Sequence, residues 1–199
     1  MKIIGLLGGV ASGKSMVAGQ LASCGAKVLN ADEIGHEVLR QPKIEAALRE
    51  RWGNAVFAAD GRIDRGRLAR IVFAPPPDGP PARAYLEQLT HAEIIPIIKE
   101  QLDALAGPGV KAAVIDAPLL AEAGLDKLCD KLIYVDAPPE VRLERALARG
   151  WRKEDFEARE DAQKSLDFKR KRADLIINNS GSPEETQAQV ERLWPALIR

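Results

Sequence analysis

The chain has 199 residues, of which 46% are hydrophobic and 29% are charged, and its formal net charge is zero. This size fits one globular domain with a sizeable core, and a neutral chain gives no global reason to expect nucleic acid or an anionic membrane as a partner. No apolar run approaches the roughly 18 residues that a membrane span needs. The two cysteines, Cys24 and Cys129, fit neither a zinc site nor a disulfide framework, so we expect inert thiols in a cytoplasmic protein.

The first predicted elements are a strand, a glycine-rich loop and a helix. Residues 2–7 form a short apolar run typical of a strand buried in a parallel sheet. The stretch "GGVASGKS" follows at 8–15 with the spacing G-x-x-x-x-G-K-S. Residues 14–23 then carry apolar positions at helical spacing, and Gly25 ends that helix. Strand, loop and helix together are the context of a phosphate-binding loop.

The chemistry of this loop points to a nucleoside triphosphate. Glycines let backbone N–H groups approach phosphate oxygens, and the N-terminus of the following helix favours an anion. Lys14 is placed to reach the β- and γ-phosphates, and the hydroxyl of Ser15 to bind Mg²⁺. The alternative is a glycine-rich turn that binds nothing.

The middle of the chain reads as one strand followed by helices. A run of five prolines and one glycine interrupts them and predicts an exposed loop, since proline this dense continues neither a helix nor a central strand. We expect a strand at 26–30, helices at 31–40 and 42–53, a helix opening near Asp64 within 62–73, the loop at 74–82, and a long helix at 82–105 bent near Pro96.

The second half alternates strands with helical patterns. We expect strands at 110–116, 130–137 and 173–179, helices at 138–150 and 183–197, and a charged helical stretch over 154–172. This alternation predicts an α/β fold, with a five-stranded parallel sheet and helices on both faces.

Two aspartates follow predicted strands. Ligands of open parallel sheets bind at the carboxyl ends of strands, so Asp32 and Asp116 should lie near the loop. Asp32 could accept a proton from an attacking hydroxyl. Asp116 resembles the second magnesium ligand of enzymes that bind nucleoside triphosphates through such a loop. Both positions also suit helix caps or turns, and spacing alone leaves these alternatives open.

Basic and histidine residues give weaker signals. Arg142, Arg145 and Arg149 share one helix face and could clamp phosphates, or they could form a solvated face with intrahelical ion pairs. The "KRKR" run at 169–172 lies among acidic residues, which favours a solvated face or a contact to a small anionic substrate. His36 is isolated, with no metal constellation around it.

Several segments, taken together, resemble the dephospho-coenzyme A kinase family over nearly the whole chain. They are "IGLLGGVASGKS", "GAKVLNADEIGHEVL", "DGRIDRGRLARIVF", "YLEQLTHAEI", "DAPLLAEAG", and a closing signature of Arg159, Gln163, Lys169, "AD" at 173–174 and "NNSG" at 178–181. The resemblance implies a three-layer P-loop NTPase fold. It implies a core over 1–31, 107–137 and 173–199, a helical substrate lobe over about 32–106, and a lid over about 138–172.

The resemblance also implies ATP-dependent phosphorylation of the ribose 3′-hydroxyl of dephospho-CoA, with Mg²⁺ as cofactor. Its catalytic residues would be Asp32, Lys14 and Arg145, and its metal ligands Ser15 and Asp116. ATP would bind to Gly9, Val10, Ala11, Ser12, Gly13, Lys14, Ser15, Met16, Arg145 and Arg149. The acceptor would bind to Asp32, His91, Arg159, Gln163 and Lys169. We expect a monomer or weak homo-oligomer.

Four positions depart from the family pattern. Asn30 stands in place of an Asp, Ala11 in place of a common Gly, Met16 in place of a common Thr, and Ala92 in place of the Pro after His91. Two rival functions stay open at this point. One is another small-molecule kinase on the same scaffold, and the other is a nucleotide-binding switch with little turnover.

Overall fold

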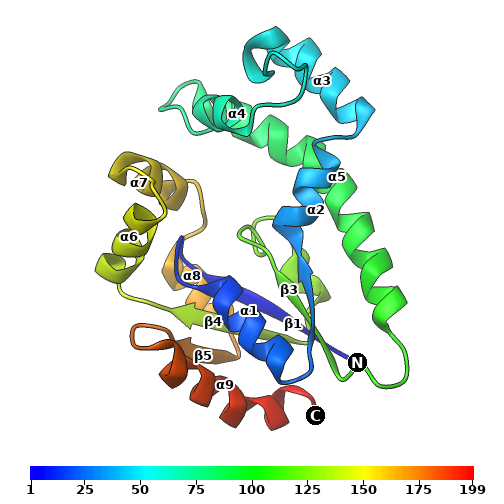
Figure 1. Ribbon diagram of the computed structural model, residues 1–199, viewed down its shortest axis with the longest axis vertical. Coiled ribbons are helices and arrows are strands. Elements are labelled where there is room, and N and C mark those ends of the chain that lie inside the picture. The colour runs from blue at the N-terminus through cyan, green and yellow to red at the C-terminus, as the bar shows by residue number, and fades with distance from the viewer. The chain divides into compact units, whose positions relative to one another are not determined.

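Five parallel strands form one sheet with the order β2-β3-β1-β4-β5 in a computed structural model that describes residues 1–199 (Figure 1). The strands are β1 (Lys2–Gly8), β2 (Lys27–Asn30), β3 (Ala112–Asp116), β4 (Lys131–Asp136) and β5 (Leu175–Asn178). Every pairing is parallel. Because β1 is central, the loop that follows it emerges between β3 and β4 at the carboxyl edge of the sheet.

Nine α-helices and two 3₁₀ turns complete the chain. They are α1 (Lys14–Ser23), α2 (Ala31–Val38), α3 (Pro42–Trp52), η1 (Gly53–Val56), α4 (Arg65–Val72), α5 (Gly79–Leu105), η2 (Leu125–Leu128), α6 (Pro139–Ala148), α7 (Lys153–Asp161), α8 (Leu166–Arg172) and α9 (Pro183–Leu197). No helix combines the length and the apolar character that crossing a membrane requires.

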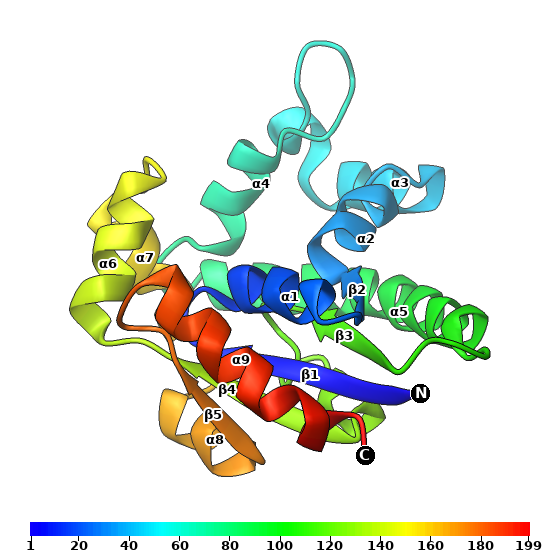
Figure 2. The ribbon, with the colours of Figure 1, turned by 60° about the horizontal axis from the view of Figure 1, so that its bottom comes forward.

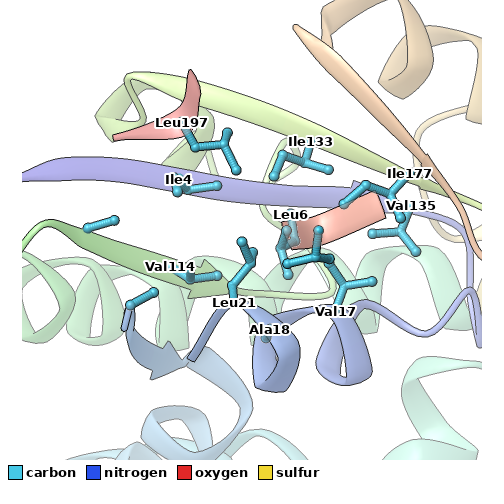
Figure 3. Close-up of a cluster of buried hydrophobic side chains, with 13 residues drawn as sticks. Ile4, Leu6, Val17, Ala18, Leu21, Val114, Ile133, Val135, Ile177 and Leu197 are labelled. Atoms are coloured by element: carbon cyan, nitrogen blue, oxygen red, sulfur yellow. The ribbon is translucent and has the colours of Figure 1, made fainter. Parts of the chain in front are cut away.

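The main core lies between the sheet and the helices α1 and α9, which lie side by side on one face (Figure 2). Figure 3 shows side chains of β1, β3 and β4 directed toward α1. The helix α8 packs against β1 and β4 outside this cluster and covers the other face. The predicted three-layer P-loop fold, with a five-stranded parallel sheet between two helical layers, is therefore confirmed.

The chain divides into two compact units. Unit 1 comprises residues 1–31 and 98–199 and contains the sheet, and unit 2 comprises residues 32–97. Within unit 2, η1 contacts both α3 and α4, and Phe57 and Ile63 form an isolated antiparallel bridge. Asp64 caps α4 by accepting a hydrogen bond of 3.0 Å from the N–H of Arg67, which confirms the predicted helix start.

The predicted exposed loop over 74–82 is wrong at its C-terminal end, because α5 already begins at Gly79. Pro80 and Pro81 lie in the first turn of that helix, where a missing backbone N–H breaks no intrahelical bond. Ala82, at which the predicted loop meets the predicted long helix, is buried. The dense prolines therefore mark both a loop and a helix start.

The predicted continuous helical stretch over 154–172 is also wrong, because α7 ends at Asp161 and α8 starts at Leu166. Ser165 caps the second helix by accepting a hydrogen bond of 3.2 Å from the N–H of Phe168. The N–H of Lys164 instead donates to the carboxylate of Glu122 at 2.9 Å. A bond to a distant segment thus replaces a helical hydrogen bond at the break.

Candidate active site

The phosphate-binding loop, residues 8–15, connects the buried strand β1 to the start of α1. Gly13 is the N-cap of α1, with φ +95°, a left-handed conformation that glycine adopts without steric cost. Ala11 also lies in the left-handed region, with φ +56°. The free N–H groups of the first helical turn consequently face the loop, as an anion site requires.

Lys14 is 9% exposed and folds back over the loop. Its ammonium group donates to the carbonyl of Gly9 at 2.9 Å and to that of Gly8 at 3.3 Å. These bonds hold a positive charge at the centre of the loop. A phosphate group bound there would meet both this charge and the helix N-terminus.

Residues distant in sequence hold the loop from its other side. Asn179 is 1% exposed, and its amide donates to the carbonyl of Ser12 at 2.7 Å. Its own carbonyl oxygen accepts from the hydroxyl of Thr186 at 3.0 Å. A side chain on Gly13 would collide with Asn179, so this close approach requires glycine. The "NNSG" segment is therefore a support of the phosphate-binding loop.

The three arginines of α6 and its C-cap differ in their burial and in their hydrogen-bond partners. Arg145 donates to the carbonyls of Ser12 and Asn179, at 3.3 and 2.9 Å, so its charge lies beside the loop. Arg142 is 2% exposed and is paired with Glu160. Arg149 is the exposed C-cap residue of the helix. The structure thus brings Arg145 to the predicted ATP site and makes Arg142 part of the interior.

The carboxyl ends of β2 and β3 bring two predicted polar positions together. Asn30 and Asp116 are register partners, and Asp116 is 6% exposed. Ser15 lies in the first turn of α1 and is exposed. A serine hydroxyl and a carboxylate are oxygen ligands of the type Mg²⁺ prefers. Two protein ligands leave most of the octahedral shell of Mg²⁺ open, so such an ion would need phosphate and water ligands as well.

Two predicted acceptor residues of the α7–α8 region form a buried cluster with Glu122. Lys169 is 1% exposed, and its ammonium lies 3.1 Å from Oε1 of Glu122 and donates to Gln163 at 2.6 Å. The other carboxylate oxygen of Glu122 is buried and has no hydrogen-bond partner. Arg159 stacks over the ring of Trp151 at 4.4 Å. Lys169 is therefore already neutralised within the protein.

Unit 2 carries the remaining predicted residues and a cavity. Asp32 lies in the first turn of α2, and His91 is half-buried in α5. A separate cavity of ≈ 610 Å³ in this unit is lined by His36, Leu39, Arg40, Glu45, Arg62, Ile63 and Arg65. Its three arginines and one glutamate leave two positive charges, and Arg65 also bonds to His36.

Sequence reasoning missed the roles of Glu122, Asn179, Glu160 and the cavity arginines. Glu122, Asn179, Arg62 and Arg65 all lie inside the segments that resemble the family. The resemblance of those segments to the family is the signal that could have identified these four residues. No sequence signal marked Glu160, because its partners, Arg142 and Val10, are distant along the chain.

Comparisons with known proteins agree with this geometry. A family model described as dephospho-CoA kinase matches residues 2–185. A curated dephospho-CoA kinase of Bacillus licheniformis is 41% identical over 194 residues, covering 96% of this chain and 94% of the relative. One of Symbiobacterium thermophilum is 43% identical over 199 residues, covering 98% of this chain and 81% of the relative.

Solved structures agree as well. Dephospho-CoA kinase from Campylobacter jejuni superposes with a TM-score of 0.63 at 26% identity, covering 99% of this chain and 97% of that one. Shikimate kinase from Acinetobacter baumannii, with a TM-score of 0.51, 15% identity, and coverage of 100% of this chain and 93% of that one, shares the fold alone. With the family model spanning nearly its whole length, this chain belongs to the dephospho-CoA kinase family.

Proposed function

We propose that the protein transfers the γ-phosphoryl group of ATP to the ribose 3′-hydroxyl of dephospho-CoA, giving coenzyme A and ADP. The observation that carries this proposal is the family match over residues 2–185. Phosphoryl transfer depends on positioning and charge stabilisation. The buried Lys14 and the phosphate-binding loop of unit 1 can supply both.

On the donor side, residues 9–16 would bind the triphosphate through backbone N–H groups. Lys14 would exchange the carbonyls of Gly8 and Gly9 for phosphate oxygens. Arg145 and Arg149 would offset the charge that develops on the transferring group. The hydrogen bonds that fix Arg145 to the loop support its assignment, because a fixed charge needs little reorganisation during transfer.

Mg²⁺ fits the oxygen ligands described above. Ser15 and Asp116 would hold the ion, which would neutralise charge on the phosphates when bound. The 6% exposure of Asp116 supports this role, since a buried carboxylate is costly unless a cation partners it.

We assign the role of catalytic base to Asp32. It follows Asn30, the last residue of β2, by two positions along the chain. Ligands of this fold class bind at the carboxyl ends of strands, so a carboxylate there is suited to accept the proton of the attacking hydroxyl.

We assign the cavity of unit 2 to the diphosphate of the acceptor. That group carries two negative charges, which match the two net positive charges of the cavity lining. Arg40 forms no salt bridge with an acidic residue, and Arg65 bonds to the imidazole of His36 rather than to a carboxylate, so no acidic residue neutralises either arginine. Leu39 and Ile63 add apolar surface for the adjoining organic groups.

The other predicted acceptor residues are His91, Arg159, Gln163 and Lys169. Lys169 and Gln163 would act from a fixed cluster with Glu122, while Arg159 lies on the same helix as Glu160. We further propose that residues 32–106 form the acceptor lobe and residues 138–172 a lid that closes to exclude water from the γ-phosphate. The enzyme would act in the cytoplasm as a monomer or weak homo-oligomer, without nucleic acid or a membrane.

A coupled ADP-release assay with a panel of acceptors tests the function. We expect turnover with dephospho-CoA and none above background with shikimate or AMP. Asp32→Asn should lower kcat by roughly 10²–10⁴-fold, because a general base typically contributes that much, and should leave the Kd for ATP unchanged. Glu33→Gln, the neighbouring residue, is the matched control. Wild-type kcat in Asp32→Asn would refute the assigned base, and turnover independent of dephospho-CoA would refute the proposed reaction.

A further inference from the structure

The apex of the phosphate-binding loop, Val10 and Ala11, packs into an apolar cluster of the α6–α7 region. Val10 is 7% exposed and is buried with Ala146 and Phe156. Leu143, Trp151 and Ala11 pack around them. The apex thus shares one small core with α6 and α7, separate from the main core under α1.

An ion pair holds both backbone groups of Val10. The N–H of Val10 donates to Oε1 of Glu160 at 3.4 Å, and its carbonyl accepts from Nη1 of Arg142 at the same distance. Nη1 of Arg142 also bonds to that carboxylate oxygen. The pair therefore forms a bracket that fixes the peptide groups on either side of Val10.

The surroundings of Arg142 leave this bracket little freedom. Its side chain is 2% exposed, and its Nε donates to the carbonyl of Ala137 at 3.1 Å, just beyond the end of β4. A Cβ on Gly9 would lie 2.6 Å from Nη1 of Arg142. The loop backbone thus runs directly against the guanidinium group, and the guanidinium is anchored to the sheet.

Glu160 lies near the end of α7, next to Arg159, which is one of the predicted acceptor residues. Because Glu160 binds the loop apex through its carboxylate, a shift of α7 changes the hydrogen bonding of Val10. A buried cation that loses its partner is also strongly unfavourable, so the pair must stay closed for the loop to keep this shape.

We infer that Arg142 and Glu160 are positioning residues that set the conformation of the loop apex for nucleotide binding and couple it to α7. This inference rests on the proposed function only in taking ATP as the ligand of the loop. Neither residue is assigned contact with ATP or with the acceptor.

The test uses Glu160→Gln, which keeps the shape of the side chain and removes its charge. We expect the Kd for ATP, measured by calorimetry on folded protein, to rise about tenfold, and the KM for dephospho-CoA to stay within about twofold. The matched control is Glu157→Gln on the same helix, whose exposed side chain pairs only with Lys153 at 3.5 Å. It should change neither constant.

If Glu160→Gln does not fold, the Kd of Arg142→Lys for ATP tests whether the pair positions the loop for nucleotide binding. A lysine keeps the charge beside Glu160 but cannot donate to Val10 and Ala137 together, so ATP binding should weaken by a smaller factor. A lowered melting temperature with an unchanged Kd for ATP would overturn the inference, because the pair would then be only structural. Equal weakening of both substrates would overturn it too. Failure of the wild type to bind ATP would instead refute the proposed function.

Discussion

Ala11 is the one residue other than glycine with a left-handed backbone, at φ +56°, and it lies in the phosphate-binding loop. A Cβ in this conformation costs roughly 1–2 kcal/mol, whereas glycine adopts it freely. The loop therefore carries local strain at its apex. The packing of Ala11 against Val10 and its neighbours provides surrounding structure that can hold it there.

Replacing Ala11 with glycine should relieve this strain. The gain is partly offset because glycine makes the unfolded chain more flexible, by about 0.4–1 kcal/mol, so we expect a net stabilisation of about 0.5 kcal/mol. Urea unfolding measures it. Ala22→Gly in α1, where Ala22 is exposed, is the control and should destabilise by about 1 kcal/mol. Equal losses in both variants would contradict the assigned strain.

Cys129 gives the stability of the protein an alkaline pH dependence. Burial, followed by the charges of Asp126 and Asp130, raises the pKa of its thiol to about 12. The raised value in the folded state means that its contribution to stability is complete below the unfolded pKa, near 8.5, and is lost as the pH rises toward 12. In that window the free energy of unfolding should fall by roughly 1.4 kcal/mol per pH unit from this group.

The measurement compares urea unfolding of the wild type with that of Cys129→Ala at pH 8 and at pH 10. The wild type should lose more stability between the two values than the variant, since only the wild type carries this thiol. Cys24→Ala should retain most of the wild-type slope, because Cys24 is the less buried thiol. Parallel losses in wild type and Cys129→Ala would show that the thiol ionises normally.

At the scale of elements, α8 is held on the sheet by a buried charge. Lys169 is 1% exposed and pairs with Glu122, in the segment after β3, at 3.1 Å. The same carboxylate oxygen accepts from the N–H of Lys164 just before α8. One glutamate therefore fixes both the break after α7 and the docking of α8.

Lys169→Met should destabilise the protein by roughly 3–5 kcal/mol, because it leaves the carboxylate of Glu122 buried without a cation. The double variant Lys169→Met/Glu122→Gln should recover most of this loss, since neither charge then remains. Denaturant unfolding without substrate measures both. Lys171→Met removes an exposed lysine from the same helix, where its partner is Asp167, and should cost at most about 1 kcal/mol. No recovery in the double variant would mean that packing, rather than charge, dominates.

The order of elements could be predicted from the sequence because its signals are local. The run at 2–7, Gly25 and Asp64 mark a strand, a helix end and a helix start through neighbouring residues alone. The break between α7 and α8 has one local signal, the N-cap residue Ser165, but the bond from Lys164 to Glu122, 42 positions away, could not be predicted in this way.

The site residues show the same difference between local signals and contacts that only the fold creates. Lys14 and the loop follow from spacing, as does the position of Asp116 at the end of a strand. The bracket around Val10 and the cavity around Arg40 bring together residues of separate elements, and only the fold places them side by side. The sequence therefore predicts the residues that would bind ATP better than the residues that hold them in place.

At the scale of the whole molecule, the phosphate-binding loop and the cavity proposed for the acceptor diphosphate lie in different units. The phosphate-binding loop and Arg145 belong to unit 1, and the cationic cavity belongs to unit 2. Substitutions in the loop should therefore affect ATP and substitutions in the cavity should affect dephospho-CoA, whereas Arg159, Gln163 and Lys169 of unit 1 are assigned to the acceptor. This separation can be tested with kinetics.

Arg40→Gln should raise the KM for dephospho-CoA about tenfold, because it removes a charged contact to the diphosphate, and should leave the KM for ATP within about twofold. Adenosine, which lacks the diphosphate, should be insensitive to the change as an acceptor. Arg70→Gln removes the same charge from an exposed position of unit 2 outside the cavity and is the control. A rise in the KM for ATP alone, or no change with dephospho-CoA, would refute the assignment of the cavity.

The strand order has a consequence for synthesis on the ribosome. The strand β2 pairs only with β3, and β1 pairs only with β3 and β4, so neither has a neighbour until residue 112 has been made. At about 5–20 residues per second, the 82 residues from Asn30 to Ala112 take roughly 4–16 s. Unit 2, continuous from 32 to 97, emerges during that wait. The first two strands thus stay unpaired for seconds, and the buried strand β1 makes this an interval in which a holding chaperone would matter.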